Sequence, residues 1–322
     1  EAPAPPQTPV SQDFFKPGDR VAIIGGGLAD RMQHHGWMET LLQSAFVELS
    51  LDLKVSFRNH GYTGDRFNHR PRNQGFLGPD EYLTLSKASV IFAMFGFNES
   101  FDEDPDGFGT SVAEWITHTR AQNYSGTGAP RIVLFSPIAA QDLRDSNLPD
   151  AGELNRRLGS YVAAMETVAD EAGVHFIDLF TPTLHHFSMK KTPLTINGVH
   201  LNSAGNRFVG ELITKAFCGG LPSASSEEIE TLRQAVIDKN KHWFNRYRAT
   251  DGNDVWGSRS GLSFTDGQNN RVVLQRELVQ LDMMTDNRDK SVWAAAKGDD
   301  LLPDDSEVPP AILVKTNLDK PQ

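Results

Sequence analysis

The chain has 322 residues, of which 39% are hydrophobic and 23% charged, and its formal net charge is −11. This composition is typical of a globular protein, and the length allows one domain of about 200 residues with an extension. The negative charge argues against non-specific binding to nucleic acid or to an anionic membrane surface, because both reward positive charge. No apolar run approaches the roughly 20 residues of a membrane span. Neither a nucleic-acid partner nor a membrane span is therefore expected.

The single cysteine, Cys218, excludes an internal disulfide and a cysteine-based metal cage, and it fits a core position. The first ten residues, EAPAPPQTPV, resemble the Pro/Ala-rich spacer that remains after removal of an export signal. We therefore expect residues 1–17 to form a spacer and the protein to be periplasmic or secreted.

Over residues 18–220, short apolar runs alternate with longer amphipathic stretches. This alternation predicts an α/β domain in which helices cover both faces of a parallel sheet, with the ligand site beyond the carboxyl ends of the strands. The predicted strands cover residues 20–25, 53–58, 88–95, 131–136 and 174–179, and the predicted helices cover residues 28–49, 109–124, 152–172 and 203–217.

The pattern changes after residue 220, where no strand alternation returns. A Ser-Ser-Glu-Glu cap predicts one long helix over 225–248, and a second helix is predicted over 272–297. We expect a helical C-terminal extension over 221–298 and an extended tail over 299–322. Its aromatic side chains are expected to pack on the main domain, although a loop near Trp256 also allows a homodimer with shared pockets.

Three glycines, Gly25–Gly27, follow the first predicted strand and precede a helix. A dinucleotide-binding fingerprint needs another glycine at position 30, where Asp30 would instead face the phosphates. No Gly-Lys-Ser/Thr follows, so the segment is not a P-loop either, and no cofactor is expected. The glycines could also form only a tight turn at a strand-to-helix junction, with an anion at the helix N-terminus.

Four segments resemble, in order and spacing, the signature blocks of SGNH (GDSL-type) hydrolases: Gly25–Leu28, Asn59–Gly64, Gly96–Glu99 and Asn197–His200. The resemblance covers residues 18–218 and implies an SGNH/flavodoxin-like three-layer sandwich with hydrolase activity. The chain resembles a planctomycete-type member of the family, also in its segment Asn287–Lys290, and it is divergent because Gly27 stands where the family has its nucleophilic serine.

By this resemblance, the N–H of Gly61 and the amide of Asn98 are oxyanion donors, and His200 is the general base. Two triad members are replaced together, since Gly27 stands for serine and Asn197 for aspartate. A serine needs a base, and the base needs a partner on its other nitrogen. The amide of Asn197 can orient the imidazole but cannot offset the charge of an imidazolium.

Three functions stay open at this point. In the first, which we expect, a carbohydrate-acting hydrolase uses water as the nucleophile, and His200 or Glu99 takes the proton. In the second, a glycosidase pairs Glu99 with a second carboxylate from Asp30, Asp65 or Asp102. The third is a catalytically inactive glycan-binding module.

A cluster of basic residues suggests that the glycan is acidic. Within it, Arg66 would bind carboxylates or sulfates if the loop lies beside Gly61. The alternative is that these cations pair with nearby acidic residues. The cluster comprises Arg58, His60, Arg66, His69, Arg70 and Arg72, and its possible partners are Asp65, Asp80 and Glu81.

The other candidate residues also have structural explanations. His200 could be a core histidine, Glu99 a carboxylate at a helix start, and Asn98 a turn residue. The adjacent pairs His34-His35 and His185-His186 point to different sides of their elements, so no metal site is expected.

Overall fold

The computed structural model describes residues 10, 13–72, 75–189, 192–248 and 252–316. Most of the spacer expected over 1–17 and the last six residues of the expected tail therefore lie outside the described residues. The described part of that tail, residues 299–316, contains no helix or strand.

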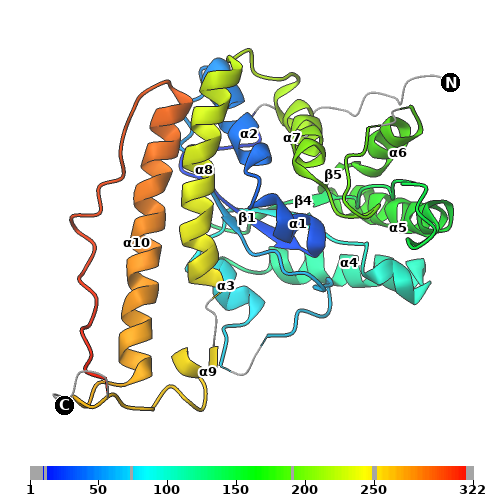
Figure 1. Cartoon of the computed structure of the whole chain (residues 1–322). Helices are drawn as coiled ribbons and strands as arrows, with labels where there is room; N and C mark the ends of the chain where they lie inside the picture. Colours follow the sequence, from blue (N-terminus) through cyan, green and yellow to red (C-terminus); the bar gives the residue numbers. More distant parts are fainter. Residues whose placement is uncertain (1–9, 11–12, 73–74, 190–191, 249–251, 317–322) are drawn as a thin grey trace.

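In the described part of the chain, five parallel strands form one sheet in the order β2-β1-β3-β4-β5 (Figure 1). This confirms the predicted α/β class, and the carboxyl ends of all strands meet at one edge of the sheet. The strands are β1 (Arg20–Gly25), β2 (Ser56–Asn59), β3 (Val90–Met94), β4 (Arg131–Phe135) and β5 (His175–Ile177).

Helices cover both faces of the sheet, and β1 shows how its sequence produces this. Val21 and Ile23 enter the hydrophobic cluster on one face, whereas Ala22 and Ile24 enter the cluster on the other. Because both faces are buried, the strand is apolar at each position from Val21 to Ile24 instead of at every second one. One face carries α1 (Gly27–Met32), α2 (Trp37–Glu48) and α7 (Ser203–Cys218), and the other carries α3 (Pro79–Leu85), α4 (Pro105–Arg120) and α5 (Ala151–Ala172).

The helix predicted over residues 28–49 is two helices, α1 and α2. Gly36 adopts a left-handed φ of 71° and caps α2. A Cβ atom on Gly36 would lie 3.2 Å from Cγ1 of Val236, so this turn also lets the C-terminal extension approach closely. The sequence analysis also missed α3, the short 3-10 helix η1 (Glu99–Asp102) and α6 (Phe180–Met189).

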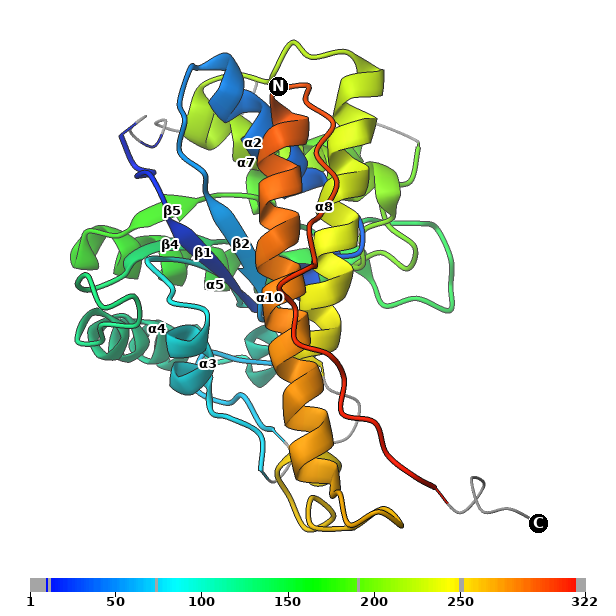
Figure 2. The same ribbon diagram turned by 90° about the vertical axis from the view of Figure 1, so that its left-hand side faces the viewer.

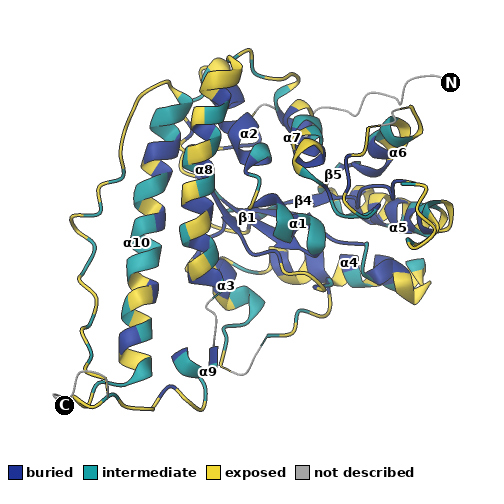
Figure 3. Ribbon diagram, in the orientation of Figure 1, coloured by how far each residue is buried: buried dark blue, intermediate teal, exposed yellow. Residues whose placement is uncertain are grey.

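The C-terminal extension is helical, as predicted, and lies along the edge of the sheet beside β2 (Figures 1 and 2). Its long helices α8 (Ser226–Tyr247) and α10 (Asn270–Ala296) pack together through apolar residues that include Leu232, Val236 and Val292. A capping box between Ser225 and Glu228 starts α8. Along α8, buried and exposed positions alternate at helical spacing (Figure 3). The short α9 (Gly252–Val255) lies between α8 and α10 in sequence.

The extension satisfies the outward-facing carbonyl groups of the edge strand. In and around β2, alternate residues point their carbonyls away from β1, where no strand follows. Side chains of the extension donate to four of these groups in succession. Trp293 Nε1 lies 2.8 Å from Val55 O, Lys239 Nζ 3.0 Å from Phe57 O, Trp243 Nε1 2.7 Å from Asn59 O, and Arg248 3.0 Å from Gly61 O.

Buried ion pairs join the same two layers. Lys239 is fully buried and lies 2.6 Å from a carboxylate oxygen of Glu39 on α2. Arg58 on β2 makes a two-pronged contact with Asp289 of α10, the shorter distance being 2.6 Å. Such pairs cost desolvation energy, which only close and well-oriented partners offset.

The loop around Trp256 packs within its own chain. The ring of Trp256 lies 5.1 Å from that of Phe76, centroid to centroid. A homodimer therefore stays a prediction without support from this loop. None of the helices among the described residues is both long and apolar enough to cross a membrane.

Replacing Lys239 by Met should destabilise the fold by about 3–5 kcal/mol, because it leaves the buried carboxylate of Glu39 without its partner. The double variant Lys239→Met/Glu39→Leu should recover much of that loss, since both buried charges are then removed. Denaturant unfolding of the three proteins measures this. Equal stability of the single variant and the wild type would contradict a structural role for the pair.

Candidate active site

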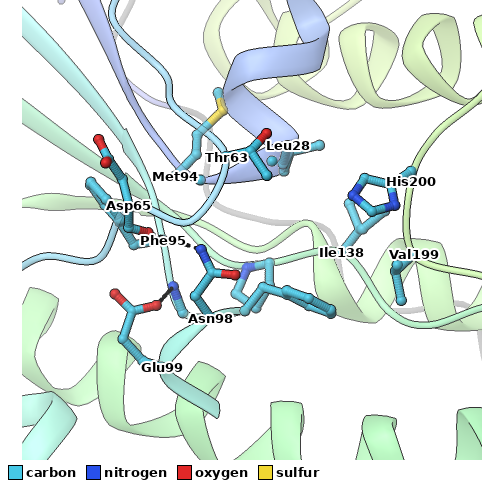
Figure 4. Close-up of a pocket in the computed structure, with 15 residues that line it drawn as sticks. Leu28, Thr63, Asp65, Met94, Phe95, Asn98, Glu99, Ile138, Val199 and His200 are labelled. Atoms are coloured by element: carbon cyan, nitrogen blue, oxygen red, sulfur yellow. Dashed lines mark hydrogen bonds between the residues drawn. The ribbon is translucent and has the colours of Figure 1, made fainter. Parts of the chain in front are cut away.

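A cavity of about 580 Å³ lies at the carboxyl ends of β1 and β3, where a parallel sheet is expected to place its site. Loops from distant parts of the sequence meet there (Figure 4). The lining residues include Gly26, Gly27, Thr63, Asp65, Asn98, Glu99, Val199 and His200. Asn98, Glu99, His200 and Gly27 are therefore brought together as the sequence predicts.

His200 faces the bare backbone of Gly27, the first residue of α1. A Cβ atom on Gly27 would lie 3.4 Å from Nε2 of His200. A side chain at this position would thus be in ordinary contact with the imidazole. Because Gly27 has no side chain, the cavity extends to Nε2 of His200 and leaves room there for a small molecule such as water.

Asn197 fixes the orientation and tautomer of His200. Its Oδ1 lies 3.1 Å from Nδ1 of His200 and also accepts from the backbone N–H of the same residue at 3.0 Å. Because a backbone N–H can only donate, the atom facing Nδ1 is the amide oxygen, and Nδ1 carries the proton. Nε2 is then the unprotonated nitrogen, and it is the atom of His200 nearest to a Cβ position on Gly27.

The imidazole is held in its neutral form. Burial lowers the pKa of His200 below its usual 6.5, and the positive charge of Arg31 lowers it further. A neutral imidazole can accept a proton at physiological pH, which is the state that a general base requires.

The amide of Asn98 lies close to Gly26. A Cβ atom on Gly26 would lie 2.8 Å from Nδ2 of Asn98, so the amide occupies the space that a side chain at position 26 would need. The same Nδ2 donates to the backbone oxygen of Asp65 at 3.0 Å, which leaves its second hydrogen for another acceptor.

The role expected for Gly61 needs correction. Its N–H donates to Oδ1 of Asn59 at 2.8 Å, and Gly61 does not line the cavity. It is a glycine because a Cβ atom would lie 2.5 Å from the backbone nitrogen of Asp30. In this loop the cavity is lined by Thr63 and Asp65, the residues on either side of Gly64.

Glu99 connects two loops. One carboxylate oxygen accepts from the N–H of Phe67 at 3.0 Å and the other from that of Gly96 at 2.9 Å. Burial raises the pKa of Glu99, whereas these hydrogen bonds oppose the rise. With both oxygens engaged by backbone donors, its contacts are those of a structural carboxylate.

The other acidic candidates also have partners. Asp30 accepts from Arg248 and from the hydroxyl of Thr63, both at 2.7 Å, and it does not line the cavity. Asp65 is bound by both terminal nitrogens of Arg72, each at 2.8 Å. Asp102 pairs with Arg66. These contacts disfavour a glycosidase that relies on two of these carboxylates.

The basic cluster mainly follows the alternative prediction that its arginines pair with acidic residues. Arg72 pairs with Asp65, as that alternative stated, whereas Arg66 pairs with Asp102 and Arg58 with Asp289. Arg66 is not among the residues that line the cavity, and its contact with a substrate stays a prediction.

The C-terminal extension holds the loop of residues 60–65 in place. The ring of Tyr62 contacts two guanidinium groups, with Arg248 3.4 Å and Arg72 4.5 Å from its centroid. Tyr247 donates to the carbonyl of His60 at 3.0 Å. Because the same loop supplies the oxygen of Asp65 that orients Asn98, α8 contributes indirectly to the geometry of the site.

Thr63 and Arg31 were not among the predicted residues of this region, and Asp65 was considered only as a second carboxylate or as a partner of the basic cluster. Thr63 belongs to the block Asn59–Gly64 and Asp65 directly follows it, so their place beside the cavity could have been found from that block. Arg31 follows Gly27 by four residues, a spacing that places both on one face of a helix. Among the described residues, no group of three or more His, Cys, Asp or Glu side chains could hold a metal ion.

His200 should titrate with a pKa below 6.5 in an NMR pH titration, and its nitrogen shifts should show the proton on Nδ1 above that pKa. Asn197→Asp should raise this pKa, because a carboxylate stabilises the imidazolium. A wild-type pKa above 6.5, or no rise in the variant, would contradict the geometry described.

Comparisons with known proteins identify the family. The profile of the GDSL-like lipase/acylhydrolase family matches residues 18–208, more than half of the chain. No curated protein matches the chain significantly in sequence. Solved structures with a similar fold include a gut microbial diltiazem-metabolizing enzyme, with 18% identity, a TM-score of 0.47, and coverage of 64% of this chain and 48% of that one.

This chain thus spans about half the length of that enzyme. Another similar structure is a catalytic mutant of the acetylxylan esterase Axe2 from Geobacillus stearothermophilus, with 15% identity and a TM-score of 0.48. The match covers 63% of this chain and 95% of that one. A third is an acetyl xylan esterase, AlAXEase, with 20% identity and a TM-score of 0.45. The match covers 61% of this chain and 98% of that one. On the family match, the chain belongs to the GDSL-like lipase/acylhydrolase family.

Proposed function

We propose that this protein hydrolyses an acyl ester of a carbohydrate and that water, rather than a serine, attacks the acyl carbon. The observation that carries the proposal is the space beside Nε2 of His200, where a Cβ atom on Gly27 would lie at 3.4 Å. The family supplies the acylhydrolase class. Carbohydrate as the acyl carrier is part of the proposal.

In the proposed reaction, a water molecule beside Gly27 attacks the ester carbon while Nε2 of His200 takes its proton. The tetrahedral intermediate then expels the sugar hydroxyl, which receives that proton from the imidazolium. The products are a carboxylic acid and the free sugar. The role fits the neutral, oriented imidazole, whose other nitrogen donates to Asn197.

Two donors are available for the negative charge that develops on the ester oxygen. The N–H of Gly27 belongs to the first turn of α1, where a helix has no acceptor of its own for it. The second is the free hydrogen on Nδ2 of Asn98. Fixed donors of this kind stabilise the transition state without reorganisation.

The neutral amide of Asn197 limits the rate of this reaction. A carboxylate would stabilise the imidazolium that forms, whereas an amide only orients the ring. We therefore expect a slow esterase with a low kinetic pKa, and with activity that rises with pH as His200 loses its proton.

Hydrolysis of acetylated oligosaccharides, followed by mass spectrometry, should release acetate with the wild type. The activity should fall about 100-fold or more in His200→Ala and in Asn98→Ala, because one loses the base and the other an oxyanion donor. His185→Ala is the matched control, since this histidine is exposed on α6. Unchanged glycans with every protein would favour the binding module instead, and shortened chains would favour a glycosidase.

Gly27→Ser alone should form little acyl-enzyme, because Asn197 lacks the charge that a serine–histidine pair needs. The double variant Gly27→Ser/Asn197→Asp should form much more, since a serine Cβ fits beside His200. A fluorophosphonate probe with intact-protein mass spectrometry measures this. Strong labelling of the single variant would show that Asn197 is not the limiting replacement.

A further inference from the structure

A second, small hollow lies next to His200. Its space of about 190 Å³ is open to solvent and is lined by Gly27, Leu28, Arg31, Val199, His200, Leu201 and Asn206. Four of these residues also line the candidate active-site cavity. The two spaces therefore adjoin each other around the imidazole, and Arg31 belongs only to the second.

Arg31 differs from the other arginines near the site in having no acidic partner. Arg66, Arg72 and Arg248 each pair with a carboxylate, whereas the described residues place no carboxylate oxygen within 4.0 Å of Arg31. Its neighbour Asp30 is already engaged by Arg248 and Thr63. The positive charge of Arg31 is thus not neutralised by an adjacent side chain.

The guanidinium of Arg31 is also incompletely hydrogen-bonded. Its Nε atom is buried, yet it has no hydrogen-bond partner among the described residues. A buried donor without a partner costs free energy that a bound acceptor would recover. The charge reaches the catalytic ring, because Arg31 contributes to the lowered pKa of His200.

We propose that Arg31 binds a negatively charged oxygen group, a carboxylate or a sulfate, carried by the same sugar whose acyl group faces Gly27 and His200. This inference rests on the proposed function and deepens it, because it assigns an acidic substrate to that site. A guanidinium offers parallel N–H donors to two oxygens of one anion, which matches both groups.

The spacing along α1 explains how one substrate contacts both residues. Gly27 and Arg31 are four residues apart, so they lie on one face of the helix, one turn from each other. A sugar ring that places its ester beside Gly27 directs a neighbouring substituent along this face. The anion therefore belongs close to the acylated position and not at a remote subsite.

The test measures binding of unacetylated oligosaccharides by calorimetry, so that turnover does not interfere. The probes are an oligogalacturonide, a sulfated galactan oligosaccharide and a neutral xylo-oligosaccharide. The wild type should bind at least one acidic probe about tenfold or more tightly than the neutral one, as expected for a charge-assisted contact. Arg31→Gln should abolish this preference, and the two acidic probes distinguish carboxylate from sulfate.

Arg207→Gln is the matched control, because Arg207 lies nearby on α7 but already pairs with Glu211 at 3.0 Å. It should keep the preference for the acidic probe. Arg31→Lys keeps the charge without the planar fork, so it should retain part of the preference. If Arg31→Gln does not fold, the Lys variant alone decides. Unchanged affinity of that variant for the acidic probe would overturn the proposed contact between the planar guanidinium of Arg31 and the anion.

Acetylated forms of the same probes are assayed for hydrolysis in parallel. No acidic preference in the wild type, or a preference that survives in folded Arg31→Gln, overturns the inference even if hydrolysis occurs. If binding of the acidic probe depends on Arg31 but no acetylated probe is hydrolysed, the anion subsite is supported and the proposed function is contradicted.

Discussion

The structure depends on how the edge strand β2 is closed. A parallel sheet leaves the carbonyl groups of its last strand unpaired, and here they receive hydrogen bonds from Trp293, Lys239 and Trp243. These hydrogen bonds join the C-terminal extension to the α/β domain along β2. At its carboxyl end the same series continues through Arg248 to Gly61 and thus reaches the loop that borders the cavity.

The strands and layers could be predicted because each depends on local patterns. Apolar runs mark β1 and β3, and the alternation of strands and helices implies a parallel sheet. The close approach of Val236 to Gly36 could not be predicted, because the two residues lie 200 positions apart in the chain. Likewise the partner of Arg58 is Asp289, and no local pattern indicates that pairing.

The candidate site was predictable where blocks of residues carry it, and less so where single contacts decide. Gly27, Asn98, Asn197 and His200 meet as their blocks imply. The role expected for Gly61 was not predictable from its block, because only the structure shows that its N–H is bound by Asn59 and that Thr63 and Asp65 line the cavity in this loop. Where the family resemblance places serine and aspartate, this chain has Gly27 and Asn197, and Asn197 orients the imidazole of His200.

Turnover of an acetylated oligosaccharide in ¹⁸O-labelled water, quenched within one catalytic cycle, tests the central proposal most directly. Mass spectrometry of both the products and the intact protein should find the label in acetate and no acyl group on the protein. An acyl adduct on the protein, or label in the sugar in place of acetate, would contradict direct attack of water on the acyl carbon.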